Sequence, residues 1–149
     1  MKSFDVNITT VRENAIIPTK ATSGSAGFDL HACIDKDLTI KKGDLIRVPC
    51  GIAIELPSSE YAAFIFARSG LGIKYGISLS NGVGVIDSDY RGEIKVPIYN
   101  DSNIFQVIEN KERVAQMIIL PYLSVTFNEV DNLSESNRSD SGFGSTGNK

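Results

Sequence analysis

The chain has 149 residues, enough for one domain with a sizeable core, and its hydrophobic (42%) and charged (22%) fractions are ordinary for a globular protein. Its net charge of −3 argues against broad electrostatic binding of nucleic acid. Cys33 and Cys50 are too few for a disulfide framework and no secretory signal or bilayer-spanning run is visible, so we expect reduced, partly buried thiols in a cytoplasmic protein.

Short alternating or β-branched runs recur about every ten residues, a pattern typical of all-β proteins. The expected strands cover residues 4–9, 44–49, 51–56, 61–66, 77–79, 83–86, 93–99, 105–108, 114–120 and 124–129. Only residues 69–75 have a helical pattern, with Ser69 as the expected cap. Pro97 predicts an edge position or a bulge in its strand. These elements predict an all-β, jelly-roll-like sandwich or barrel with one short helix.

Two stretches in the first half of the chain carry polar groups of interest. In residues 25–30, Asp29 could serve the water shell of a metal, although most Asp residues after glycine form turns. In residues 67–71, Arg68, Ser69 and Gly70 follow a strand and open the short helix, where orphan N–H groups bind phosphate. A capped turn with a solvated arginine is an equally good interpretation.

Residues 81–93 form a glycine-containing stretch that predicts a hairpin whose backbone approaches a ligand closely and pairs with a base edge. Asp87 follows an apolar run, so we expect it to be half-buried and able to accept a proton from water. Tyr90 could cover the face of a sugar. The alternative is a hairpin loop with ordinary solvated acids, which is the better interpretation for Asp89 and Glu93.

In residues 113–119, the strand alternation places Gln116 on the same face as apolar neighbours, where its amide needs a partner. That partner is either a core hydrogen bond or a ligand. His31 is the only histidine, so it cannot build a multi-histidine zinc site, and we expect it to be exposed and incidental. A Walker-type phosphate loop is absent, so any metal is expected to be Mg²⁺ carried largely by phosphates and water.

The C-terminal segment changes composition. Residues 132–149 are dominated by Ser, Asn, Asp and Gly, which bury too little to order themselves. Within them, Arg138 and hydroxyl groups suit phosphate oxygens, glycines let backbone N–H groups approach an anion, and Phe143 suits a nucleobase. We predict a domain over residues 1–130 and a C-terminal arm over residues 131–149 that closes over a nucleotide triphosphate. A flexible tail without a binding role is the competing interpretation.

These five stretches, in this order, resemble the five motifs of the trimeric deoxyuridine triphosphatases (dUTPases). The most specific parts are residues 84–92, which read GVIDSDYRG, and residues 142–147, which read GFGSTG. The resemblance implies a jelly-roll subunit and a homotrimer in which each active site draws on all three chains. It also implies hydrolysis of dUTP to dUMP and pyrophosphate with Mg²⁺, which limits uracil in DNA and supplies dUMP for thymidylate synthesis.

The resemblance also implies residue roles. Asp87 would activate the water that attacks the α-phosphorus, and Tyr90 would pack against deoxyribose and refuse a 2′-OH. Asp29 would bind Mg²⁺ only through water. The other substrate-binding positions that it implies are Arg68, Ser69, Gly70 and Gln116 for the phosphate chain, Asn81, Gly84 and Val85 for uracil, and Arg138, Phe143, Gly144, Ser145 and Thr146 in the arm.

One departure concerns the arm, where Ser139 and Ser141 replace two glycines that are usual in the family's last motif. A serine resists a positive φ, so closure of the arm could be altered. Two alternative interpretations of the function remain. The related dCTP deaminases share the fold, and a jelly roll can serve as a non-enzymatic interaction module. A regulatory protein partner is a further expectation if the chain is phage-borne.

Overall fold

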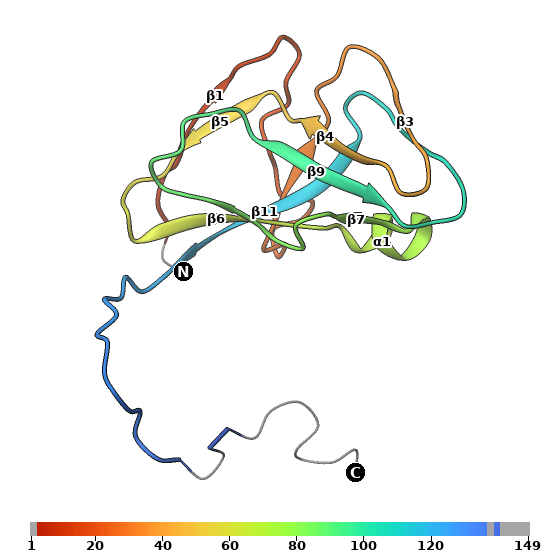
Figure 1. The fold of residues 1–149 in the computed structure, drawn as a ribbon. Coiled ribbons are helices and arrows are strands. Elements are labelled where there is room, and N and C mark those ends of the chain that lie inside the picture. Colours follow the sequence, from red (N-terminus) through yellow and green to blue (C-terminus); the bar gives the residue numbers. More distant parts are fainter. Residues whose placement is uncertain (1–2, 137–138, 141–149) are drawn as a thin grey trace.

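The computed structural model describes residues 3–136 and 139–140 (Figure 1). Within them the chain forms eleven strands and one short helix. In chain order these are β1 (Asn7–Thr10), β2 (Phe28–His31), β3 (Leu38–Ile40), β4 (Leu45–Pro49), β5 (Ile52–Glu55), β6 (Tyr61–Phe66), α1 (Ser69–Tyr75), β7 (Ile77–Leu79), β8 (Gly84–Ile86), β9 (Lys95–Asn100), β10 (Gln106–Ile108) and β11 (Arg113–Pro121). The predicted class, mostly β with one short helix, is confirmed.

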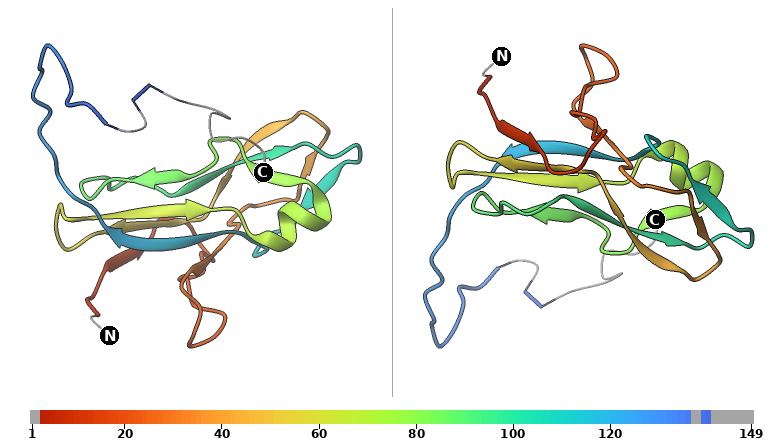
Figure 2. Two further views of the ribbon diagram at one scale, coloured as in Figure 1. Left: turned by 90° about the horizontal axis from the view of Figure 1, so that it is seen from below. Right: turned by 90° about the horizontal axis from the view of Figure 1, so that it is seen from above.

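The strands pair in an antiparallel manner into two larger and two smaller sheets. The first larger sheet has the order β2-β11-β6-β8, and the second has the order β4-β9-β7. The smaller sheets are β1-β5 and β10-β3. Figure 2 shows β6 running beside β11, with α1 at the end of β6. The helix therefore begins beside the part of the sheet where β2 pairs with β11.

Buried side chains from both larger sheets form one hydrophobic cluster. It includes Leu30 of β2, Ala63 of β6, Val114 of β11, Val48 of β4 and Ile98 of β9, all at most 1% exposed. The two sheets therefore pack against each other, as in a β-sandwich, and each buries its apolar face. Cys33 and Cys50 are both free and buried, as predicted from their number and spacing. Burial raises the pKa of the Cys50 thiol to about 12.

Most predicted strands are confirmed with shifts of one to three residues at their ends, but β2 and β3 were missed. The β2 sequence, Phe-Asp-Leu-His, carries two polar residues in four, and β3 has only three residues. Each becomes a strand because a partner far along the chain pairs with it: β11 for β2 and β10 for β3. Local pattern does not encode such a partner.

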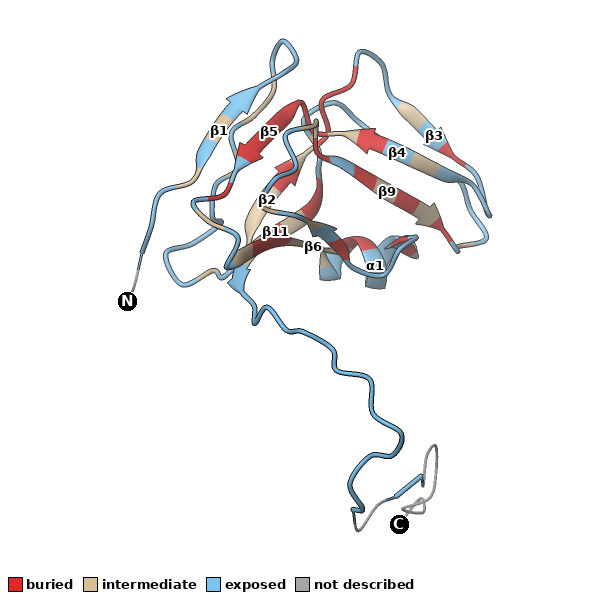
Figure 3. Cartoon of the chain, turned by 60° about the vertical axis from the view of Figure 1, so that its left-hand side comes forward, coloured by how far each residue is buried: buried red, intermediate tan, exposed pale blue. Residues whose placement is uncertain are grey.

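The predicted strand at 124–129 is wrong. The chain leaves the packed body after β11, and residues 122–136 are exposed (Figures 1 and 3). The last backbone contact to the body before this segment is Tyr122 N–H to the Glu60 carbonyl at 3.0 Å. Beyond it Leu123 and Phe127 are 89% and 93% exposed, so the alternating pattern has no pairing strand within the part of the chain described. The boundary predicted at residue 130 stays a prediction.

Helix α1 occupies the predicted residues, but its cap differs from the prediction. Arg68, not Ser69, is the N-cap residue, and among the described residues no side chain caps the helix. The helix ends at Gly76, which takes φ of 66° and donates its N–H to the Gly72 carbonyl at 3.1 Å. A residue in the left-handed region closes a helix readily when it is glycine. The first turn of α1 therefore leaves its N–H groups free of side-chain caps.

Pro97 lies in β9, the central strand of its sheet, and the register of β9 with both neighbours is regular, so neither the edge position nor the bulge predicted for it is found. Its carbonyl accepts the Ser80 N–H at 3.0 Å, just beyond the end of β7. The N–H and carbonyl of one residue in a strand point to the same side. The N–H that proline lacks would therefore point past the end of β7, so its absence costs no hydrogen bond between β9 and β7. Among the described residues, no helix is long and apolar enough to cross a membrane.

Candidate active site

Three of the sequence stretches meet around one cavity of about 300 Å³ beside the start of α1. The first stretch contributes the loop before β2 and Asp29, the second contributes the start of α1, and the fourth contributes Gln116 of β11. Residues far apart in sequence converge because β2 pairs with β11, and β11 pairs with β6, which leads into α1. The lining residues are Ala21, Ser25, Ala26, Gly27, Asp29, Arg68, Ser69, Gly70 and Gln116.

Asp29 lies between two guanidinium groups in this cavity wall. Arg68 Nε is 3.2 Å from Asp29 Oδ1, and Arg113 Nη1 is 3.2 Å from Asp29 Oδ2. The Asp29 side chain is only 14% exposed, whereas Arg68 is 26% and Arg113 49% exposed. One carboxylate thus orients two cations and leaves several of their N–H donors free, which is an arrangement that suits an anion. Sequence reasoning missed Arg113, although it opens the fourth stretch.

Gln116 makes one of the two contacts expected of its amide, a hydrogen bond within the protein, while its contact with a ligand stays a prediction. Its Nε2 donates to the Ala67 carbonyl at 3.1 Å, and the side chain also lines the cavity. A Cβ at Gly27 would lie 2.8 Å from Gln116 Oε1, so only glycine fits there without displacing the amide. The amide is therefore held from two sides. Ser69 and Gly70 precede the first intrahelical bond, which is donated by Leu71, so their N–H groups face outward at the start of the helix.

The third stretch lies elsewhere and is not a hairpin. β7 pairs with β9 in one sheet, while β8 pairs with β6 in the other, so the intervening turn crosses between sheets. Gly82 takes φ of 69° in that turn, which favours glycine. A second cavity of about 170 Å³ is lined by Asn81, Gly84 and Val85, together with Arg47, Ile65, Leu79, Ile86, Lys95 and Pro97. β8 is the outermost strand of its sheet, so one backbone edge is available to pair with a ligand.

Asp87 directly follows β8 and is exposed, not half-buried as we expected. Its carbonyl accepts the Tyr90 N–H at 3.1 Å, and the Tyr90 hydroxyl donates to the Glu93 carbonyl at 3.1 Å. Asp89 is exposed, as predicted. Glu93 is not a solvated acid: its side chain is 14% exposed and bonded on several sides. Sequence reasoning missed it, because nothing local distinguishes it from Asp89.

The two cavities lie at opposite edges of one sheet. Asp29 pairs with Gln116, which pairs with Phe66 on the other side, and the neighbouring Ile65 pairs with Gly84. Three strand spacings separate β2 from β8, which is roughly 14 Å. Asp87 lies roughly 10 Å further along the strand direction. Within one chain, Asp87 therefore does not reach the cavity that holds Asp29.

His31 is half-buried, contrary to the exposed position we expected. Burial is the main cause that lowers its pKa below the ordinary value, and its Nδ1 is buried without a hydrogen-bond partner in the structure. Among the residues that the structure describes, no three His, Cys, Asp or Glu side chains cluster to hold a metal ion. A divalent cation therefore fits this chain only if a ligand such as a phosphate chain brings most of its oxygen ligands. Asp29 retains lone pairs that could accept from the water of such an ion.

The predicted arm lies mostly outside the described residues. Arg138, Ser141, Phe143, Gly144, Ser145 and Thr146 belong to that part. Ser139 is described, and it takes φ of 47°, the left-handed conformation that its replacement of a glycine put in question. Its N–H donates to the carbonyl and to Oγ of Ser136, both at 3.1 Å. Serine is thus accommodated there by a local turn, at a cost of roughly 1–2 kcal/mol relative to glycine.

A family model for the dUTPases matches residues 13–147. The chain is also 49% identical, over 149 residues, to the deoxyuridine 5'-triphosphate nucleotidohydrolase of Desulfitobacterium hafniense, with 99% of each chain covered. This chain belongs to the dUTPase family. A second relative in this dUTPase family, the deoxyuridine 5'-triphosphate nucleotidohydrolase of Bordetella avium, is 49% identical over 147 residues, again with 99% of each chain covered.

Solved dUTPase structures share the fold. A mutant dUTPase of Staphylococcus bacteriophage 80alpha, described as bound to dUpNHpp, superposes with a TM-score of 0.83 at 20% identity and covers 97% of this chain and 99% of its own. A mutant dUTPase from phage phi11 of S. aureus, whose description names a structural Mg(II) ion, superposes with a TM-score of 0.75 at 18% identity, covering 87% and 98%. These likenesses confirm the jelly-roll class that the strand pattern predicted.

Proposed function

We propose that this protein hydrolyses dUTP to dUMP and pyrophosphate. The observation that carries the proposal is the convergence of three dUTPase-like stretches on one polar cavity in which Asp29 orients Arg68 and Arg113. In that cavity Arg68, Ser69, Gly70 and Gln116 would bind the phosphate chain. Arg113, for which the resemblance implied no role, would add a second guanidinium group for the phosphates. Phosphoryl transfer asks mainly for positioning and charge neutralisation, and these groups supply both.

Mg²⁺ would enter with the triphosphate. It would neutralise phosphate charge, while the Asp29 carboxylate holds water from its coordination shell. This role agrees with the bonding of Asp29, because a carboxylate that already accepts from two arginines is better suited to accept from a bound water than to coordinate an ion directly. The two arginines also keep the carboxylate fixed where the phosphates would lie.

Asp87 would accept the proton of the attacking water and orient it at the α-phosphorus, and it would also accept from the 3′-OH. The separation of Asp87 from the Asp29 cavity in one chain supports a site shared between copies, in which a second subunit supplies Asp87. Its exposure supports the same arrangement, since an exposed turn is free to enter a neighbour's cavity. Together with the resemblance to the trimeric dUTPases, this leads us to propose a homotrimer with three shared sites.

The free edge of β8 would bind uracil. Backbone groups of Gly84 and Val85, with the Asn81 amide, would pair with the base as a further strand would. Tyr90 would face the deoxyribose and exclude a 2′-OH. In the arm of a third subunit, Phe143 would stack on uracil while Arg138, Gly144, Ser145 and Thr146 would bind the γ-phosphate end. A chain that ends at residue 137 should then keep its trimer and lose most of its turnover.

A nucleotide panel with Mg²⁺ tests the activity. Pyrophosphate release should be fast with dUTP and slow with dTTP, UTP and dCTP. Ammonia release from dCTP would instead indicate a deaminase and would overturn the proposal. The free, buried thiols agree with a reducing compartment, so we propose that the enzyme works in the cytoplasm.

Mixing two variants of very low activity tests the shared site. Asp87→Asn removes the proposed base and Arg68→Met removes a phosphate contact, and each trimer alone should have at most about one hundredth of the wild-type activity. After dissociation and reassembly together, a fraction of the sites combines an intact phosphate cavity from one chain with an intact Asp87 from another. Activity should reappear in the mixture. Activity that stays this low in trimers shown by mass spectrometry to contain both variants would contradict sharing between copies.

Regulatory binding is a second proposal, supported by the similarity to phage proteins. One solved structure is of the 80alpha dUTPase, and its description states that phage dUTPases control transfer of virulence genes. The Asp87→Asn variant separates the two activities, because it should lose hydrolysis while any partner binding persists.

A further inference from the structure

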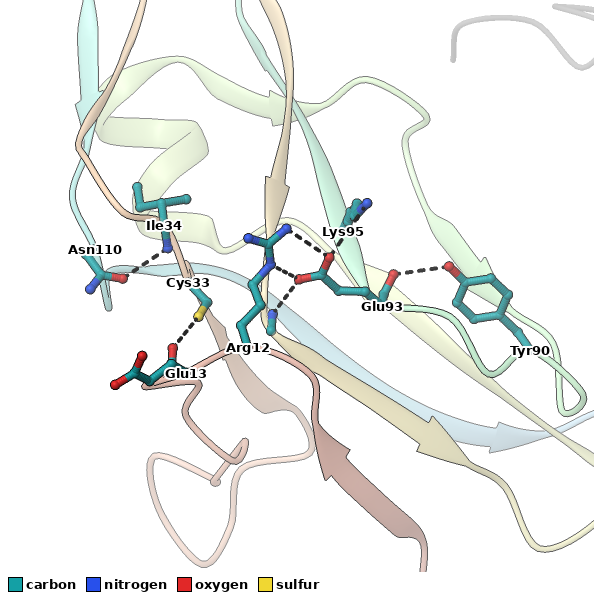
Figure 4. Close-up of polar contacts among 9 residues, drawn as sticks. Arg12, Glu13, Cys33, Ile34, Tyr90, Glu93, Lys95 and Asn110 are labelled. Carbon is teal, nitrogen blue, oxygen red and sulfur yellow. Dashed lines mark hydrogen bonds and ion pairs between the residues drawn. The ribbon is translucent and has the colours of Figure 1, made fainter.

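Glu93 ties three separate parts of the fold to the end of the turn that carries Asp87 (Figure 4). Its Oε1 accepts from the Gly51 N–H at 3.1 Å and from Arg12 Nε, and its Oε2 accepts from Arg12 Nη2 at 3.2 Å. Lys95 Nζ lies 3.6 Å from the same Oε2. Arg12 follows β1, Gly51 lies between β4 and β5, and Lys95 begins β9. One carboxylate therefore fixes the turn against several strands.

The carboxylate remains charged in this position. Burial would raise the pKa of Glu93, but the bonds from Arg12 and Gly51, with the charges of Arg12 and Lys95, lower it below the ordinary value. A carboxylate that is only 14% exposed and has this many donors has a well-defined orientation, because rotation would break its bonds to charged donors. Such a group makes a firm anchor for the backbone to which it belongs.

The same residue holds Tyr90. The Glu93 carbonyl accepts the Tyr90 hydroxyl at 3.1 Å, and Figure 4 shows Tyr90 on the opposite side of Glu93 from Arg12. The ring lies against Gly92, where a Cβ would be 2.3 Å from Tyr90 Oη. Tyr90 also donates its N–H to the Asp87 carbonyl. Hydrogen bonds to the backbone carbonyls of Asp87 and Glu93 thus join Asp87, Tyr90 and Glu93 into one unit, with the mostly buried Glu93 carboxylate at its fixed end.

We propose that Glu93 is a positioning residue of the active site, which sets the place of the Tyr90 ring and through it the discrimination between deoxyribose and ribose. This inference rests on the proposed hydrolysis of dUTP. Glu93 touches no substrate in it. A displacement of the Glu93 backbone shifts the acceptor of the Tyr90 hydroxyl, and a ring that is free to move leaves room for a 2′-OH.

The test compares selectivity, measured as kcat/KM for dUTP divided by kcat/KM for UTP. Glu93→Gln keeps the volume and an acceptor for Gly51 but removes the charge that Arg12 and Lys95 face. We expect the ratio to fall roughly tenfold, which corresponds to the free energy of about one charge-assisted hydrogen bond. The ratio cancels any change in the folded fraction, so a purely structural role would leave it unmoved. Arg12→Gln removes the guanidinium that bonds the Glu93 carboxylate and should also lower the ratio.

Glu55→Gln is the matched control. Glu55 of β5 pairs with Arg91, which lies in the same turn as Tyr90, but both side chains are about half exposed, at 49% and 51%. An exposed pair contributes little, so its ratio should change less than about twofold. If Glu93→Gln fails to fold, Arg12→Gln decides. Unchanged ratios in the Glu93 and Arg12 variants, or an equal fall in Glu55→Gln, would overturn the proposal for Glu93. Wild-type protein without activity on dUTP would instead overturn the proposed function.

Discussion

The cavity beside α1 and the turn after β8 differ in how far a single chain completes them. In the cavity, Asp29 pairs with two arginines and Gln116 is held between Ala67 and Gly27. After β8, the Tyr90 hydroxyl bonds to the Glu93 carbonyl, but the carboxylate of Asp87, the proposed base, is exposed. The proposed phosphate cavity is thus preorganised within one subunit, which would lower the cost of ordering on binding. The proposed catalytic base, Asp87, would be completed by contact with a second subunit.

The largest effect should come from Asp87→Asn. The amide keeps the shape of the carboxylate but cannot accept the proton of water, so kcat should fall by roughly 10²–10⁴. Because Asp87 is exposed, the thermal midpoint should stay unchanged. Steady-state pyrophosphate release and a thermal melt measure the two quantities. Activity within a few-fold of wild type would contradict the proposal that Asp87 is the catalytic base.

Arg68→Met should have the next largest effect, on the other region. It removes one guanidinium from the cavity and leaves Asp29 paired with Arg113 alone. We expect kcat/KM to fall about 100-fold, since charge-assisted contacts to phosphate are lost in both the bound and the transition state. Lys36→Met, an exposed change in the turn before β3, is the control for loss of one positive charge. An equal fall in both variants would mean that general charge, not the cavity, binds the phosphates.

Gly27→Ala should have a smaller effect that reports on preorganisation. The new Cβ would lie 2.8 Å from Gln116 Oε1 and displace the amide from Ala67. We expect KM to rise about tenfold and the unfolding free energy to fall by about 1–3 kcal/mol. Gly24→Ala in the same loop is the matched control, because no atom lies within 4 Å of its Cβ. Equal behaviour of the two variants would contradict a role for the closely packed Gln116.

The smallest effect is a pH dependence at the anchor of the Asp87 turn. The folded-state pKa of Glu93 lies below its ordinary value of 4.5, so the charge of Glu93 stabilises the fold above the unfolded-state pKa. That contribution is lost as pH falls through the folded-state pKa. The stability gap between wild type and Glu93→Gln, measured by urea unfolding, should be constant from pH 7 to about pH 5.5 and shrink below about pH 4.5. A gap that widens in acid would contradict the ion pairs.

Sequence patterns found the elements whose signal is local. β6, β7 and α1 occupy the predicted residues, because β-branched runs and turn residues act over a few neighbours. β2 escaped detection because it is a strand only through its pairing with β11. The run at 124–129 has the local pattern but no partner strand in the part of the chain described. Propensity alone therefore erred in both directions.

The residues of the candidate site divide in the same way. Asp29, Arg68 and Gln116 could be chosen from the sequence, since polar groups beside glycines or in apolar strands call for a reason. Arg113 and Glu93 could not, because surface arginines and glutamates are common and only their partners distinguish them. Glu93 takes its partners from positions up to 81 residues away, which no local window contains.

The sequence by itself determined the strand-rich class, the short helix and the five dUTPase-like stretches, because each depends on neighbouring residues. Only the tertiary structure decided that three stretches meet where β2 and β11 lie beside the end of β6, while Asp87 follows β8, the strand at the far edge of the same sheet. Strand order is set by which apolar faces bury together across the whole chain, and that order fixes the distance between groups that the sequence merely names.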